Sequence, residues 1–276
     1  MNQKTVLGII MALIALTMLT TFASAAPAGP RNLDRIYDSH WPVWDALTMT
    51  AMAGNVSELI FNASTVTRTY QGYFGNITGF ITLGDSQNNT LYDWSVASPK
   101  GQIYAVRDPT VPVWETVTCA SQDELQSEDL RIGANETIDE DSVNRTFVVG
   151  GAPDQIARFG STELIHPQFW VANQSILENS CPLAVMYNDS YMPSPYFKEV
   201  MLSDNTAGHV PTGLGDTTGF VIYTAIIAHS MNPFAESMGF DQRNHDFEMI
   251  VGENGHGNDT GTTATTSTYY FYVEMI

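Results

Sequence analysis

The sequence predicts an all-β fold, a β-sandwich of jelly-roll or Greek-key type with an extended N-terminal arm and long surface loops. Threonine makes up 29 of the 276 residues and aromatic side chains make up 11%, and both classes favour strands. Short segments of alternating apolar side chains are separated by clusters of Gly, Asn, Asp and Pro. Helical periodicity is nearly absent after residue 25, so two packed sheets are expected.

The chain begins with the features of a secretory signal peptide, residues 1–25. Lys4 supplies a positive charge, residues 5–22 form an uncharged and mostly apolar run, and Ala23-Ser24-Ala25 has the small-x-small pattern that a signal peptidase accepts. We expect cleavage here, a secreted protein at the extracellular cell surface, and no membrane contact afterwards. An uncleaved anchor is the alternative, because a run of about 18 residues is borderline for spanning a bilayer.

Residues 26–53 predict an extended arm ahead of a β domain at 54–276, whose division into two subdomains stays open. The arm contains prolines and lacks alternation until Leu47, Met49 and Ala51, which share one side of an extended segment. That segment suits an assembly strand that pairs with the sheet edge of a neighbouring subunit. It equally suits an ordinary first strand of its own sheet.

Strands are predicted in chain order at 58–70, 76–83, 90–96, 102–107, 113–119, 145–149, 169–172, 183–187, 196–202, 220–228 and 269–275. The continuous apolar run 220–228 is typical of a central strand buried on both faces. The acidic segment 121–144 predicts a long surface excursion with room for one short helix. The Gly/Thr-rich segment 252–267 predicts a loop before the last strand.

Acidic residues outnumber basic ones by 30 to 11, which gives a formal net charge of −19. A surface of this sign repels phosphate backbones and excludes nucleic acid as a partner class. The patterns Gly-x-Ser-x-Gly, His-Glu-x-x-His and the P-loop are absent from the sequence, and its six histidines have no His or Cys partner at metal-ligand spacing. We therefore expect no enzymatic activity, no catalytic residues and no cofactor-binding residues.

The cysteines and the glycosylation sequons agree with export. Cys119 and Cys181 predict one disulfide in an oxidising compartment, worth about 3–4 kcal/mol in the chain-entropy model, with two buried free thiols as the alternative. Nine Asn-x-Ser/Thr sequons occur where the composition predicts about three by chance, so N-linked glycans are expected. The sequons lie at Asn55, Asn62, Asn76, Asn88, Asn135, Asn144, Asn173, Asn188 and Asn258.

Two features of the sequence suit a bound ligand. Asp139, Asp141 and Asn144 place oxygen atoms at near-alternate positions in a turn-rich loop, as a Ca²⁺ site requires, although a solvated acidic loop is the alternative. A set of aromatic residues suits a sugar-stacking platform or, alternatively, a hydrophobic core. Its members are Trp41, Trp44, Tyr70, Tyr73, Phe74, Tyr92 and Trp94.

Five segments resemble a family of secreted archaeal proteins of unassigned function. They are Tyr70–Leu83 (YQGYFGNITGFITL), Asn89–Trp94, Gly101–Ala105, Asp246–Val251 and Tyr269–Glu274. The resemblance covers residues 54–276 and implies an archaeal surface location without any catalytic residues. More loosely, an exported β domain with an N-terminal arm resembles the subunits of archaeal bundling pili and bacterial matrix fibres. In those fibres an arm strand completes the sheet of the next subunit.

The sequence leads to three functional hypotheses. The favoured one is a structural subunit of an extracellular filament, sheath or other cell-surface assembly, in which copies of the chain join by strand complementation. The second is a monomeric secreted binding module, an adhesin that depends on glycan or Ca²⁺. The third is an extracellular hydrolase. Export, dense sequons, β patterning and the lack of catalytic motifs favour the first.

Overall fold

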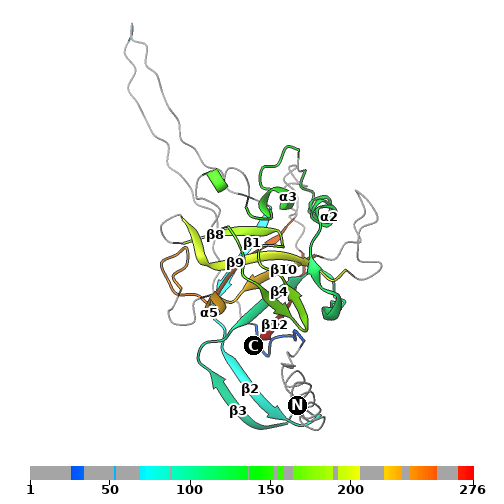
Figure 1. The fold of residues 1–276 in the computed structure, drawn as a ribbon, viewed down its shortest axis with the longest axis vertical. Coiled ribbons are helices and arrows are strands. Elements are labelled where there is room, and N and C mark those ends of the chain that lie inside the picture. Colours follow the sequence, from blue (N-terminus) through cyan, green and yellow to red (C-terminus); the bar gives the residue numbers. More distant parts are fainter. Residues whose placement is uncertain are drawn as a thin grey trace, which may run out of the picture.

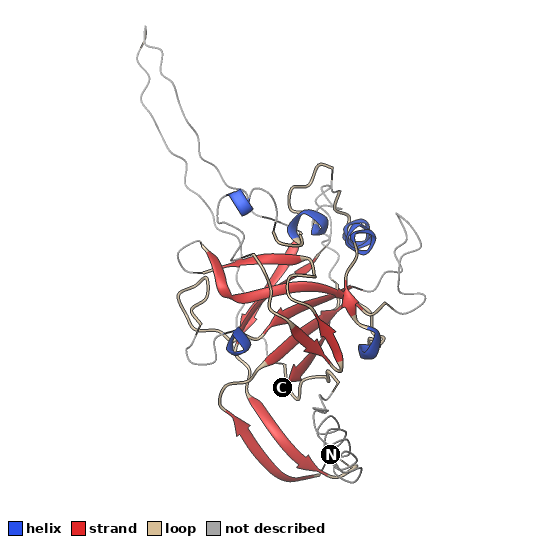
Figure 2. Ribbon diagram, viewed as in Figure 1, coloured by secondary structure: helices blue, strands red, loops and turns tan. Residues whose placement is uncertain are grey.

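A computed structural model of the chain is rich in strands (Figures 1 and 2). The described residues are 26–33, 53, 67, 69–87, 89–135, 137–151, 155–157, 164–188, 192–205, 221–231, 237–253 and 267–276. The signal-like segment 1–25 lies outside them, as does most of the predicted arm.

The main element is a six-stranded antiparallel sheet with the order β12-β4-β10-β9-β5, in which β8 also pairs with β9. Its strands are β4 (Gly101–Val106), β5 (Thr118–Cys119), β8 (Leu183–Tyr187), β9 (Pro193–Ser203), β10 (Val221–Ile226) and β12 (Tyr270–Met275). Every residue of β4 and β10 is buried. Both faces of the sheet are therefore covered, which explains the continuous apolar run of β10.

The first face carries the larger hydrophobic core. Tyr223 and Met201 point into it from the sheet, and Leu125 and Met249 pack against it from other elements. These covering elements are α2 (Gln122–Ile132), α3 (Val143–Thr146) and the two-stranded sheet formed by β1 (Tyr70–Gly75) and β11 (Phe247–Gly252).

The second face carries a separate core, to which Ile222 and Tyr104 contribute from the sheet. A 3-10 turn, η2 (Trp114–Thr116), inserts its tryptophan there. The hairpin of β6 (Phe169–Val171) and β7 (Gln174–Ile176) packs beside it. A short helix, α5 (Ala228–Met231), follows β10. The second face thus holds the β6–β7 hairpin over the ends of the central strands.

Helix α2 lies in the acidic segment that was expected to be a surface excursion. Ser121 and Glu124 form a capping box at its start, and Gly133 ends it in the left-handed conformation. Its Asp129 carboxylate accepts the backbone N–H groups of Val143 and Asn144, which begin α3. The helix is buried on the first face, so this part of the expectation is wrong.

The predicted strands at 90–96, 102–107, 169–172, 183–187, 196–202, 220–228 and 269–275 correspond to β3, β4, β6, β8, β9, β10 and β12, with shifts at the ends. The β-rich class is confirmed. The jelly-roll or Greek-key sandwich is not confirmed, because the sheets are open.

Two predicted strands are wrong for the most part. The predicted strand at 145–149 overlaps the end of helix α3 (Val143–Thr146). Val143 and Phe147 are both buried and lie four residues apart, which is helical spacing. In 113–119 only Thr118–Cys119 is a strand, because Trp114 turns inward in η2. The predicted strand at 76–83 begins at Gly79, and most of 58–70 lies outside the described residues.

Candidate assembly surface

The β2–β3 hairpin is a separate two-stranded sheet that extends away from the body of the molecule (Figure 1). Strand β2 is Gly79–Gly84 and strand β3 is Thr90–Val96. In the described part of the chain no third strand pairs with either of them, so both outer edges are open. An isolated two-stranded hairpin is marginally stable in water, and open edges are templates for further strands.

One face of this hairpin is apolar throughout. Ile81 pairs with Trp94 and Leu83 pairs with Tyr92, and alternate residues of a strand lie on the same face. These four side chains, called the apolar face below, are 61%, 49%, 51% and 56% exposed. The rings of Tyr92 and Trp94 contact each other with centroids 4.5 Å apart. Exposed apolar side chains that gather on one face in this way are typical of interaction sites on soluble proteins.

The opposite face of the hairpin is partly covered by the N-terminal segment. Arg31 donates a hydrogen bond to Thr82, lies 3.6 Å from Asp93 and stands over the ring of Phe80 at 5.8 Å. These contacts are exposed and contribute little energy individually. Because these contacts are all on the opposite face, no described segment covers the apolar face.

The first part of the predicted arm lies on its own domain. Ala28 exchanges two backbone hydrogen bonds with Val273 of the edge strand β12, at 3.1 and 2.8 Å. The segment then runs to the hairpin, where Arg31 binds, and Leu33 is 66% exposed at the end of the described segment. The arm therefore leaves the described structure beside the hairpin. The predicted assembly strand with Leu47, Met49 and Ala51 lies outside the described residues.

The three residues suggested for Ca²⁺ are engaged with different partners. Asp139 accepts the backbone N–H of Asn135 at 2.7 Å, Asp141 accepts the hydroxyl of Thr67, and Asn144 accepts the side-chain amide of Gln122. In the described part of the chain no group of three or more His, Cys, Asp or Glu side chains is arranged to hold a metal ion. The Ca²⁺ site stays a prediction.

The predicted disulfide is present between Cys119 in β5 and Cys181 just before β8. Both strands pair with β9, so the bond joins two neighbours of the same strand. It closes a loop with a sequence separation of 62 residues.

Five of the nine sequons fall on described residues. Asn76, Asn135 and Asn173 are exposed, and Asn144 and Asn188 are half-buried. Asn173 lies in the tight turn between β6 and β7. Exposure at three sites is what an acceptor asparagine requires, and glycosylation stays a prediction. Asn55, Asn62, Asn88 and Asn258 lie outside the described residues.

The predicted aromatic set does not form one platform. Tyr70 and Tyr73 in β1 pack against the core of the first face, and Phe74 contacts Phe240 and His245. Tyr92 and Trp94 are together on the hairpin, whereas Trp41 and Trp44 lie outside the described residues. Ile81 and Leu83 were not singled out from the sequence, because their alternation is typical of any half-buried strand.

The buried acidic groups of the described chain serve the fold. Glu128 lies 3.1 Å from Arg107 and accepts a hydrogen bond from Tyr223, also at 3.1 Å. Burial raises the pKa of Glu199 well above its usual value, and its Oε2 accepts the backbone N–H of Ile250 at 2.9 Å. Both carboxyl groups thus make contacts between elements of the fold.

The chain matches no family model, no characterised protein and no solved structure. Among the described residues, no helix combines the length and the apolar character that a membrane crossing needs. Function must therefore be argued from the described surfaces themselves.

Proposed function

We propose that the protein is a secreted structural subunit that joins copies of itself into an extracellular filament, sheath or surface layer. The single observation that carries the proposal is the β2–β3 hairpin, whose apolar face and two open edges have no partner in the described chain. The signal-like segment and the nine sequons support the extracellular location.

The proposed joint is strand complementation. A strand from a neighbouring copy adds to one edge of the hairpin and makes it three-stranded, which is the smallest sheet of independent stability. Backbone hydrogen bonds supply affinity, and alternate side chains of the added strand contact the apolar face. The segment with Leu47, Met49 and Ala51 is the proposed donor, since its apolar side chains alternate.

The position of the arm fits this joint. The described residues of the arm pass from β12 to the hairpin, where Arg31 contacts the face opposite the apolar face. Donation of an arm to the next copy is a head-to-tail contact. Such a contact propagates a fibre when the rotation between successive copies does not close a ring.

A charge on the apolar face tests the proposal. Ile81→Glu would bury a carboxylate in the joint, and we expect it to weaken self-association by about 30-fold or more, the size of a hot-spot loss. Association is measured by light scattering and sedimentation of the secreted chain, and the products are imaged by electron microscopy.

Ser95→Glu is the matched control. Ser95 is exposed on the opposite face of the same hairpin, where it pairs with Phe80. The substitution therefore adds the same charge to the hairpin outside the proposed joint. Circular dichroism checks that both variants fold. Equal assembly by the two variants, or a wild-type chain that stays monomeric at every concentration and salt condition, would refute the proposal.

A further inference from the structure

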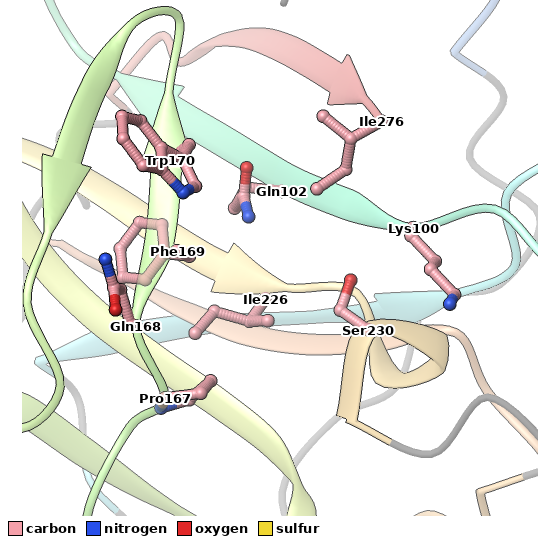
Figure 3. Close-up of a pocket in the computed structure, with 9 residues that line it drawn as sticks. All are labelled: Lys100, Gln102, Pro167, Gln168, Phe169, Trp170, Ile226, Ser230 and Ile276. Carbon is pink, nitrogen blue, oxygen red and sulfur yellow. The ribbon is translucent and has the colours of Figure 1, made fainter. Parts of the chain in front are cut away.

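A small cleft lies between the β6–β7 hairpin and the ends of β4 and β10, on the second face of the central sheet (Figure 3). Its volume is about 180 Å³. Pockets that bury drug-sized ligands measure roughly 300–1,000 Å³, so this cleft fits a single small group such as one ring. It is distant in the chain from the apolar face, and the arguments for it are independent of the proposed assembly.

The floor of the cleft holds a buried amide that is only half satisfied. Gln102 is 1% exposed, and its Oε1 lies 3.2 Å from the hydroxyl of Tyr104. Its Nε2 has no partner in the described part of the chain, and the amide stands in the middle of the cleft (Figure 3). A hydroxyl group of an occupant of the cleft would accept a hydrogen bond from this side-chain N–H.

A half-exposed indole forms one wall. Trp170 is 48% exposed and lies across the cleft from Gln102, while Phe169 and Ile226 are buried beneath (Figure 3). The turn that follows β6 is fixed to the sheet, because the carboxylate of Glu274 accepts the Ala172 N–H at 3.0 Å. The indole is therefore carried by an anchored hairpin, and its apolar plane suits the C–H face of a sugar ring.

One basic side chain, that of Lys100, lies at the rim of the cleft beside Ile276, on the side away from Trp170 (Figure 3). Lys100 is exposed and makes no ion pair within the described chain. The chain has three lysines, and Lys198 is 4% exposed with its Nζ donating to the Ser194 carbonyl at 3.0 Å. The net charge of −19 repels anions at long range. At physiological salt this repulsion is screened beyond about 8 Å, so direct contact with Lys100 dominates for an anion in the cleft.

We propose that this cleft binds one acidic sugar residue, a pyranose ring that carries a carboxylate or sulfate group. The ring stacks on Trp170, its hydroxyl groups bond to the free half of the Gln102 amide, and its anionic group contacts Lys100. Aromatic stacking, a planar amide and a single cation together select a charged ring over a neutral one.

The test follows the indole N–H signal of Trp170 by NMR while the full chain is titrated with glucuronate, glucose 6-sulfate, glucose or free glutamate. The signal is assigned by its absence in Trp170→Phe. We expect at least one acidic sugar to shift it at millimolar concentration, with about tenfold tighter binding than glucose, the effect of one hydrogen bond to a charged group. The tighter of the two acidic sugars identifies the anion.

Three variants separate the contributions. Lys100→Gln should remove the preference for the acidic sugar while glucose binding persists. Trp170→Ala should abolish binding of both sugars, and because this variant lacks the indole signal, its binding is read from the side-chain amide signal of Gln102. Trp94→Ala is the matched control, because Trp94 is 49% exposed on the distant hairpin, and it should leave the affinity unchanged. Circular dichroism confirms that each variant folds.

The proposal is overturned if no sugar shifts the Trp170 signal, or if Lys100→Gln leaves the preference intact. It is also overturned if glutamate binds as tightly as the acidic sugars, because the cleft would then receive an acidic side chain of a protein. Assembly of the subunit is measured separately, so failure here is distinguishable from failure of the proposed function.

Discussion

The buried carboxyl groups of Glu274 and Glu248 differ in the number of hydrogen bonds that they accept. Glu274 accepts hydrogen bonds from the Tyr104 hydroxyl at 2.8 Å and from the Ala172 N–H. Glu248 accepts one backbone N–H, from Phe240 at 3.0 Å. The pKa of Glu248 is raised to about 7, chiefly by burial and to a smaller extent by the negative charge of Asp241, against the lowering effect of the Phe240 hydrogen bond. A group of this kind makes stability depend on pH.

We expect the free energy of unfolding to fall as the pH rises from 4.5 to about 7, in part through Glu248. The ordinary pKa of this glutamate is 4.5, so between 4.5 and about 7 the folded chain holds a proton that the unfolded chain has released. The stabilisation is complete below pH 4.5 and is lost as the pH passes the folded value, with a slope of at most about 1.4 kcal/mol per pH unit. Urea unfolding at a series of pH values measures this slope.

Glu248→Gln should flatten that part of the curve, since the amide oxygen still accepts the Phe240 N–H but does not titrate. Glu115→Gln, at an exposed position in η2, is the control and should leave the curve unchanged. An unchanged slope in Glu248→Gln would contradict the assignment.

At the scale of elements, the local sequence predicts a strand correctly where its pattern of apolar residues matches the burial of that segment in the fold. The continuous apolar run of β10 predicts a strand buried on both faces, and every residue from Val221 to Ile226 is buried in the structure. The burial of helix α2 was not predicted, because acidic residues are usually found on the surface. Its buried acids are compensated by groups far along the chain: Glu124 accepts the Ser203 hydroxyl and Glu128 contacts Arg107. No local pattern reveals such partners.

The candidate sites were predictable to different degrees. The sequence predicts the strands of the β2–β3 hairpin and singles out Tyr92 and Trp94. It does not predict that the face with Ile81 is exposed, because alternation is the same whether a face meets a core or solvent. The cleft was not predictable, since Gln102 and Trp170 meet only through the packing of the β6–β7 hairpin on the sheet.

The start of α2 gives a prediction for an element. Ser121→Ala removes the side chain that accepts the Glu124 N–H and contacts its carboxylate at 2.9 Å. We expect a loss of about 1 kcal/mol in the free energy of unfolding, the usual cost of an N-cap. Urea unfolding followed by circular dichroism measures it. Ser98→Ala, in an exposed bend after β3, should be neutral, and equal effects of the two changes would count against the capping box.

For the whole molecule, the net charge of −19 opposes any self-association. The apolar face must act against this repulsion, which reaches about 30 Å at 0.01 M salt and about 8 Å at 0.15 M. We therefore expect assembly to increase over this range of NaCl. Light scattering of the purified chain at fixed protein concentration measures the effect. Assembly that is indifferent to both NaCl and divalent cations would show that charge does not control the interface.

The scarcity of lysine has a practical consequence for labelling. Acylating reagents react with accessible primary amines, and among the described residues Lys100 is exposed whereas the Lys198 amine is held within the fold. In a chain from which residues 1–25 and thus Lys4 have been removed, acylation would then label Lys100 and the N-terminal amine, without introducing a cysteine that would compete with the Cys119–Cys181 bond. A dye at this position would report the spacing of copies by energy transfer, and because acylation neutralises Lys100, the labelled chain should also lose the proposed preference for an acidic sugar.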